Sequence, residues 1–190
     1  MAQEVPVTDI VLESVEDVAA REVLLDLCLG EDRRAKSSER LREGRLPAEG
    51  LAFSAHGPDG RLAGTVRLWN VCAGPGKAAL LLGPLAVHPW FRKDGLGGAL
   101  MRTALDAARA RGHGAVVLVG DAPYYARFGF SAQKTGELWM PGPFDRNRLL
   151  GLELTAGALD GARGLISPTG VEIARPSLDE LIAGELRRSA

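Results

Sequence analysis

The sequence predicts an α/β fold in which a mixed central sheet carries helices on both faces. Two apolar runs, residues 78–87 and 115–119, are typical of strands that are covered on both sides. Between them, residues 95–111 place Leu96 and Leu100 on one stripe of a helix. A strand, a helix and a strand at this spacing indicate two parallel strands joined by a right-handed crossover.

The segments before the first long strand follow from capping and charge. Ser14, ahead of an acidic turn, predicts the start of a helix that ends near Leu29, and Gly30 is suited to stopping it. Residues 31–50 mix acidic and basic side chains around few apolar ones. We interpret them as a solvated connector containing a short helix, with a place beside a substrate cleft as the alternative.

A β-hairpin is predicted ahead of the long strand. Residues 51–55 and 62–69 are apolar and alternating, and turn formers lie between them in Gly57-Pro58-Asp59-Gly60. The remaining elements are expected to be a turn at 70–77, a strand at 149–154 and a peripheral helix at 177–187.

Length, charge and cysteine content narrow the class of protein. A chain of 190 residues fits one domain, which we place at residues 1–170 with a tail at 171–190. The formal net charge of −1 gives no field that would attract nucleic acid or an anionic membrane. Cys28 and Cys72 lack a Cys-x-x-Cys companion, which favours a reducing compartment and argues against a metal site. No signal-peptide pattern is evident, so we expect a cytoplasmic protein, and a homodimer stays open.

Glycines gather where the helix after the long strand begins. Gly95, Gly97 and Gly98 let the backbone approach a ligand closely, and the first turn of a helix offers amide protons without intrahelical partners. Arg92 and Lys93 precede this turn, which suits a pyrophosphate. A P-loop is excluded because no Gly-Lys-Ser/Thr follows, and the glycine spacing does not fit a Rossmann fingerprint.

The glycine segment has a counterpart in a known family. The GNAT superfamily of N-acetyltransferases carries an Arg/Gln-x-x-Gly-x-Gly/Ala loop, which this chain resembles in Arg92-Lys93-Asp94-Gly95-Leu96-Gly97. With Gly83-Pro84-Leu85-Ala86-Val87 upstream and residues 119–130 downstream, the chain looks like the YhbS-like branch over about residues 51–164. The resemblance implies acetyl-CoA as the co-substrate and no metal. It also implies a GNAT-like sheet whose central parallel strands splay apart after a bulge at Gly83-Pro84.

The resemblance further implies which residues hold the coenzyme. The pantetheine arm would bond to backbone groups where the two strands part, at Leu85, Ala86 and Val87. The pyrophosphate would lie on the loop and on the first turn of the helix, at Arg92, Lys93, Asp94, Gly95, Leu96, Gly97 and Gly98. Asp94 departs from the family pattern, because its negative charge would weaken pyrophosphate binding unless it points away or pairs with Arg92.

Candidate catalytic residues follow the second apolar strand. Tyr125 stands four residues before Gly129, where the family usually has the tyrosine that protonates the departing thiolate. A base must take the amine proton, and Asp121 is the first candidate, ahead of His88 or a glutamate of the N-terminal helical region. Asp121 has an alternative role as the cap of a short helix that begins at Ala122.

The implied reaction is direct acetyl transfer from acetyl-CoA to a primary amine of a small molecule or protein, in a ternary complex. The alternatives are a non-catalytic acetyl-CoA sensor and a transferase that uses another acyl-CoA. Residues 30–50 and 136–148 are expected to flank the acceptor, whose identity the sequence leaves open.

Overall fold

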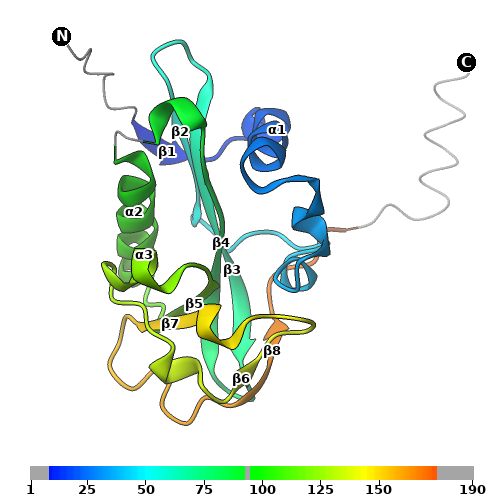
Figure 1. Cartoon of the computed structure of the whole chain (residues 1–190), viewed down its shortest axis with the longest axis vertical. Helices are drawn as coiled ribbons and strands as arrows, with labels where there is room; N and C mark the ends of the chain where they lie inside the picture. Colours follow the sequence, from blue (N-terminus) through cyan, green and yellow to red (C-terminus); the bar gives the residue numbers. More distant parts are fainter. Residues whose placement is uncertain (1–8, 93–94, 175–190) are drawn as a thin grey trace, which may run out of the picture.

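The computed structural model describes residues 9–92 and 95–174 and shows a mixed sheet with a helix on each face (Figure 1). The main path of the sheet contains, in spatial order, β1 (Ile10–Leu12), β2 (Ala52–His56), β3 (Leu62–Ala73), β4 (Ala78–Val87), β5 (Ala115–Val119) and β7 (Leu149–Glu153). A branch adds β8 (Gly164–Pro168) beside β3 and β6 (Leu138–Trp139) beside β8. The pairs β4/β5 and β6/β8 are parallel, and the other described pairs are antiparallel.

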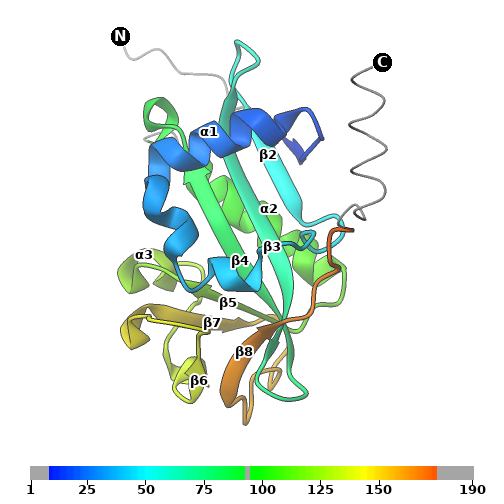
Figure 2. The same ribbon diagram turned by 90° about the vertical axis from the view of Figure 1, so that its right-hand side faces the viewer.

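Helices cover both faces of this sheet, as the sequence predicts. α1 (Asp17–Leu29) packs on β3 and β4 from one side, and α2 (Leu96–Ala110) packs on β2, β3 and β4 from the other. Figure 2 shows α1 in front of these strands and α2 behind them. The short helices are α3 (Ala122–Ala126) and the 3-10 turns η1 (Glu31–Ala35), η2 (Glu39–Leu41), η3 (Pro89–Phe91), η4 (Gln133–Thr135) and η5 (Arg146–Arg148).

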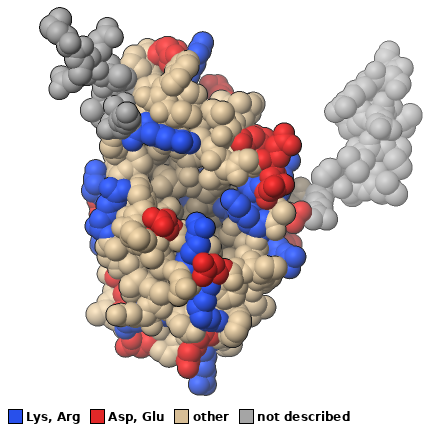
Figure 3. Space-filling model, viewed as in Figure 1, with Lys and Arg blue, Asp and Glu red and all other residues tan. Residues whose placement is uncertain are grey.

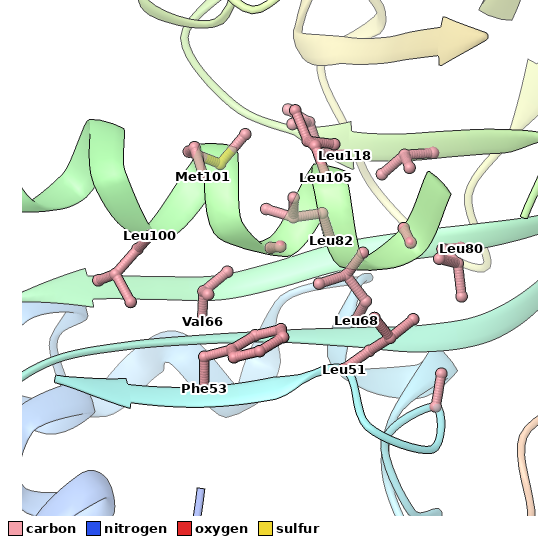
Figure 4. Close-up of a cluster of buried hydrophobic side chains, with 14 of the residues drawn as sticks. Leu51, Phe53, Val66, Leu68, Leu80, Leu82, Leu100, Met101, Leu105 and Leu118 are labelled. Carbon is pink, nitrogen blue, oxygen red and sulfur yellow. The ribbon is translucent and has the colours of Figure 1, made fainter. Parts of the chain in front are cut away.

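The face under α2 holds a large apolar core (Figure 4). Leu100 and Met101 of α2 are fully buried, as are Val66 and Leu68 of β3 in the same cluster. Complete burial of one such side chain contributes about 1.5–3 kcal/mol relative to leaving it exposed. This packing holds α2 so that its N-terminus lies beside Val87, at the end of β4.

Two element boundaries differ from the prediction. Ser14 does not cap α1, which begins at Asp17; the Asp17 carboxylate instead accepts the backbone N–H of Ser14 at 2.9 Å. Gly30 does end the helix, with a φ of 79°. The turn predicted at 70–77 is shorter, because β3 runs to Ala73, where its last residues pair with β8 as well as with β4.

The prediction of a solvated connector with a short helix at residues 31–50 is correct only in part: the segment forms η1 and η2 and most of its residues are exposed or half-buried, but two basic side chains are not. Arg33 and Arg42 are both buried, at 6% and 8% exposure. A guanidinium can be buried when carboxylates compensate its charge, and Arg33 is paired in this way with Glu22 and Asp26. The segment borders a cavity described below, which agrees with the alternative interpretation.

The other predicted strands are present. The hairpin forms β2 and β3, the two apolar runs form β4 and β5, and the strand predicted at 149–154 is β7. The helix expected at 177–187, with most of the tail at 171–190, lies outside the described residues. Among the helices that the structure describes, none has the length and hydropathy to cross a membrane.

Candidate active site

The parallel strands β4 and β5 part near the middle of the sheet. Within the described residues they pair at two positions, Leu80 with Val116 and Leu81 with Val117. β4 continues to Val87 with β3 as its partner on the other side. Its remaining edge therefore faces the opening between the strands, and the predicted splay of the central parallel pair is confirmed.

A bulge in β4 marks the place where the strands part. The register between β3 and β4 shifts there, so that Gly83 and Pro84 together oppose Arg67. Proline has no N–H for a strand ladder, and Gly83 has a φ of 129°, which a side chain would strain. The ring N–H of the buried Trp69 donates to the Gly83 carbonyl at 2.6 Å and fixes the bulge. The predicted bulge is confirmed.

A cavity of about 420 Å³ opens where the strands part, and we call it the strand cavity. Its walls come from the bulge of β4, from the end of β5 with α3, and from the segment between α1 and β2. Figure 3 shows a hollow on this side of the molecule with basic side chains near it. The candidate residues Leu85, Asp121 and Tyr125 all line this cavity.

A second cavity, of about 540 Å³, lies at the N-terminus of α2, and we call it the helix cavity. It is lined by Val87 of β4, by glycines at the start of α2, and by Arg92, Arg102 and Arg127. Tyr124 lines both cavities, so the two adjoin.

The first turn of α2 gives the helix cavity a wall rich in hydrogen-bond donors. Gly95 caps the helix in the left-handed conformation, with a φ of 73°, and its carbonyl accepts the N–H of Ala99. The N–H groups of the three residues between them have no partner within the helix. Gly97 keeps this wall open, because a Cβ there would lie 3.2 Å from the Tyr124 hydroxyl. The turn is suited to an anion.

The residues predicted to hold a coenzyme take different places. Those that line the helix cavity are Val87, Arg92, Gly95, Gly97 and Gly98. The side chains of Leu96 and Ala86 are buried in the core, so that only their backbone groups are available to a ligand. Lys93 and Asp94 lie outside the described residues, and the predicted effect of the Asp94 charge stays a prediction.

The carbonyl of Val87 is occupied within the protein. It accepts a hydrogen bond from Nε of Arg92 at 3.2 Å and from the thiol of Cys28 at 3.3 Å. A ligand on this edge of β4 must therefore use other backbone groups or displace these donors.

Sequence reasoning missed Arg102 and Arg127. Arg102 follows Gly98 by one helical turn, so the spacing places both on one face and is a signal that could have found it. Arg127 lies with its guanidinium carbon 3.9 Å from the centre of the Tyr124 ring. Its Nε donates to the Tyr124 carbonyl. The motif spacing in the sequence does not indicate this contact.

Tyr125 is half-buried between the strand cavity and the core. Its ring packs against Gly120, where a Cβ would collide with it, and stands edge-on to Tyr124 with 4.9 Å between ring centres. Burial raises the pKa of the Tyr125 phenol to about 12; Tyr124 adds to the rise and Arg148 opposes it. The hydroxyl therefore keeps its proton at neutral pH and can donate a hydrogen bond.

Asp121 is exposed at the rim of the strand cavity, at the N-cap position of α3. Its carboxylate makes no capping bond to the described residues, so the alternative role as a helix cap receives no support. His88 is not among the described residues that line the strand cavity, and its Nδ1 accepts the N–H of Trp90. Glu22 of α1 is engaged in ion pairs with arginines.

Comparison with known proteins settles the family. Residues 51–132 match the acetyltransferase (GNAT) domain. The chain is 30% identical over 151 residues to YhbS of Escherichia coli K12, an uncharacterized N-acetyltransferase, with 79% of this chain and 89% of the relative covered. The chain belongs to the GNAT family of N-acetyltransferases. The resemblance to the YhbS-like branch is confirmed.

Solved structures agree with this assignment. A crystal structure of Escherichia coli YhbS in complex with CoA matches with a TM-score of 0.73 and 28% identity, covering 89% of this chain and 93% of that one. A GNAT family acetyltransferase from Brucella melitensis in complex with acetyl-CoA matches with a TM-score of 0.57 and 26% identity, covering 80% and 98%. This GNAT enzyme therefore shares its fold with proteins whose structures contain CoA or acetyl-CoA.

Proposed function

We propose that this GNAT enzyme transfers the acetyl group of acetyl-CoA to a primary amine, directly and in a ternary complex. One observation carries the proposal: the helix cavity adjoins the strand cavity beside the point where β4 and β5 part. A diphosphate in the helix cavity and a thioester in the strand cavity would be joined by an arm along the free edge of β4. Two solved relatives of the same fold are complexes with CoA or acetyl-CoA, which supports this coenzyme as the ligand.

The charge around the helix cavity suits the diphosphate. Arg92, Arg102 and Arg127 supply guanidinium groups, and the first turn of α2 supplies backbone donors. Hydrogen bonds to charged groups are worth about 1.5–3 kcal/mol each. We expect coenzyme affinity to fall as salt is added, since exposed ionic contacts are screened.

The strand cavity would hold the acetyl group and the acceptor. The neutral amine attacks the thioester carbonyl carbon, so that a C–N bond forms and the C–S bond breaks. The amine gives a proton to Asp121, directly or through water, while Tyr125 donates a hydrogen bond to the departing sulfur. Asp121 then releases the amine proton to solvent, and the thiolate takes up one proton from solvent as it leaves, so the protons balance. The products are an N-acetyl amine and the thiol of coenzyme A.

The pKa of Tyr125 defines its part in this step. A free thiol has a pKa of ~8.5, well below the value of about 12 for the Tyr125 phenol. Complete proton transfer from the phenol to the thiolate is therefore unfavourable. Tyr125 instead stabilises the thiolate by sharing its proton in a hydrogen bond, and it stays protonated throughout the physiological range.

Replacing Tyr125 by Phe tests this role. Loss of the hydroxyl should lower kcat by about 100-fold, while the Kd for acetyl-CoA, measured by calorimetry, changes little. Turnover is followed by thiol release with a panel of primary amines. Equal turnover in the two proteins would remove Tyr125 from the mechanism.

Asp121→Asn tests the proposed base. The amide cannot accept the amine proton, so kcat/KM should fall about tenfold or more at neutral pH and recover as rising pH frees the amine. An unchanged pH profile would exclude Asp121. Tight acetyl-CoA binding without turnover of any amine would make the protein a coenzyme sensor, and faster transfer from propionyl-CoA or succinyl-CoA would change the assigned donor.

A further inference from the structure

Most of the ionisable side chains that line the strand cavity are basic. Arg33, Lys36 and Arg42, from the segment between α1 and β2, line it together with Arg148. Among its described lining residues, Asp121 alone is acidic. This excess of positive charge lies beyond the residues that would hold the diphosphate, so the coenzyme phosphates do not account for it.

Arg42 has donors that the described protein does not use. Its side chain is 9% exposed, and Nη2 pairs with Glu39 at 2.7 Å. Nε is buried and has no hydrogen-bond partner among the described residues. Nη1 lies 3.7 Å from the position of a Cβ on Gly83, which places the guanidinium beside the bulge. A buried donor without a partner is unfavourable, so this group is suited to donating a hydrogen bond to an acceptor oxygen of a ligand.

The charges around Arg42 also favour an anion beside it. Burial lowers the pKa of Arg42, Glu39 opposes the shift, and the nearby charges of Arg33 and Arg67 lower it further. Arg33 has its own carboxylate partners, Glu22 among them. Glu39 is the carboxylate paired with Arg42 among the described residues, so an anion beside Arg42 would relieve the repulsion.

We propose that the acceptor amine carries a carboxylate, which Arg42 binds with help from Lys36 and Arg148. The inference rests on the proposed function and names its substrate class. A guanidinium matches the two oxygens of a carboxylate better than an ammonium does. The volume of the strand cavity, about 420 Å³, suits a small molecule of amino-acid size beside an acetyl group.

The test compares amino acids with their amides as acceptors. Each pair presents the same primary amine, and only the acid carries the carboxylate. The amide has the less basic amine, so a larger fraction of it is unprotonated at neutral pH, and without recognition by the enzyme the amide would react faster. A preference for the acid therefore reports recognition of its carboxylate. We expect at least a tenfold higher kcat/KM for the acids that are acetylated, measured by thiol release from acetyl-CoA.

Substitutions test whether the preference for acids depends on the proposed residues. Arg42→Gln should reduce the ratio of kcat/KM for acid over amide at least tenfold, mainly through KM for the acid, and leave the Kd for coenzyme A unchanged. Because a buried arginine variant can fail to fold, Lys36→Glu provides a second test at an exposed position. Arg34→Glu makes the same charge change two residues away, on a side chain 66% exposed that is not among the described lining residues, and should have no effect.

The outcomes separate the inference from the proposed function. Acetylation of amides and simple diamines at rates equal to or above those of the acids would overturn the inference and leave the acetyltransferase assignment in place. A preference for succinyl-CoA as donor, without preference among acceptors, would also overturn it, because the basic side chains would then serve the acyl group. Coenzyme binding without acetylation of any amine would overturn both.

Discussion

The two faces of the sheet are built from different kinds of contact. Under α2, Leu68, Leu82 and Leu100 belong to one continuous apolar core. On the α1 side, the buried apolar residues divide into a small cluster that includes Leu24 and a larger one that includes Leu81, and buried charged side chains accompany them. Apolar packing on the first face fixes where α2 begins, and with it the place of the helix cavity.

The charged groups on the α1 side are connected. Glu13 lies between Arg21 and Arg67 and pairs with both. Arg21 also contacts Glu22, which in turn pairs with Arg33 at the strand cavity. On this face ion pairs add to the apolar clusters in holding the segments together, and positive charge is left beside the cavity. The comparison teaches that the proposed coenzyme site depends mainly on backbone geometry, whereas the proposed acceptor site depends on charged side chains that ion pairs hold in place.

The largest expected effect is on the α2 side, in Gly97→Glu. The new side chain would enter the helix cavity near Tyr124, and its charge would repel the diphosphate. Two like charges about 4 Å apart repel by about 4 kcal/mol at an effective dielectric constant of about 20, which is roughly 1,000-fold in affinity. Calorimetry with coenzyme A measures the loss.

Gly136→Glu is the matched control for Gly97→Glu. Gly136 is exposed and a Cβ added there would meet no atom within 4 Å, so this variant adds the same charge without entering either cavity. It should bind coenzyme A like the parent protein. Normal binding by Gly97→Glu would show that the helix cavity does not hold the diphosphate.

The second prediction compares how much one substitution on each face of the sheet destabilises the folded protein. Glu13→Gln leaves the buried Arg21 and the partly buried Arg67 without their shared carboxylate, and should cost about 3 kcal/mol in the free energy of unfolding. Leu100→Ala on the other face should cost a similar amount, about 2–5 kcal/mol, by leaving a cavity. Urea unfolding measures both.

The two losses of stability should respond differently to further substitutions. Adding Arg21→Met and Arg67→Met to Glu13→Gln removes the uncompensated charges and should restore part of the stability. The same pair of changes should not rescue Leu100→Ala, because they do not refill its cavity. A triple variant no more stable than Glu13→Gln would show that packing, not charge, dominates on the α1 side.

The sequence predicts the α2 side better than the α1 side, for a physical reason. The helix cavity is built from Arg92 and the glycines that follow, which act through local backbone geometry, so a short motif contains the signal. The ion pairs are long-range: Arg67 and Glu13 are 54 residues apart, and neither position shows in the sequence that it is buried. A mixed-charge segment such as 31–50 therefore looks solvated although Arg42 is buried.

Local and long-range signals also explain which smaller features the sequence predicts correctly and which it does not. The strands β1 and β6 have 3 and 2 residues, too few to show an alternating pattern. The sequence predicts the start of α1 from Ser14 as a capping residue, but α1 has no side-chain capping bond among the described residues, and the Ser14 N–H donates to Asp17 instead. The strands β4 and β5 are long apolar runs, and the sequence predicts their boundaries correctly.

The smallest effect concerns acid stability on the α1 side. Burial opposes ionisation of Glu22, but hydrogen bonds from Arg33 and Arg21 outweigh it and bring the pKa to about 2 from an ordinary 4.5. A carboxyl with a lowered pKa stabilises the folded protein above its unfolded pKa, and this stabilisation is lost as the pH falls from 4.5 towards 2. The side chain is 37% exposed, so solvent screening keeps the effect of Glu22→Gln to about 1 kcal/mol at pH ~7.

Urea unfolding at two pH values tests this. The difference in the free energy of unfolding between the parent protein and Glu22→Gln, called the gap below, should shrink between pH ~7 and ~3. The parent loses the ionised carboxylate over this range, and the glutamine does not titrate. The exposed Glu49, changed to Gln, serves as the control and should show little gap at either pH. A gap that stays constant would mean that Glu22 acts through packing, and the ionic character assigned to the α1 side would then rest on Glu13 and its two arginines.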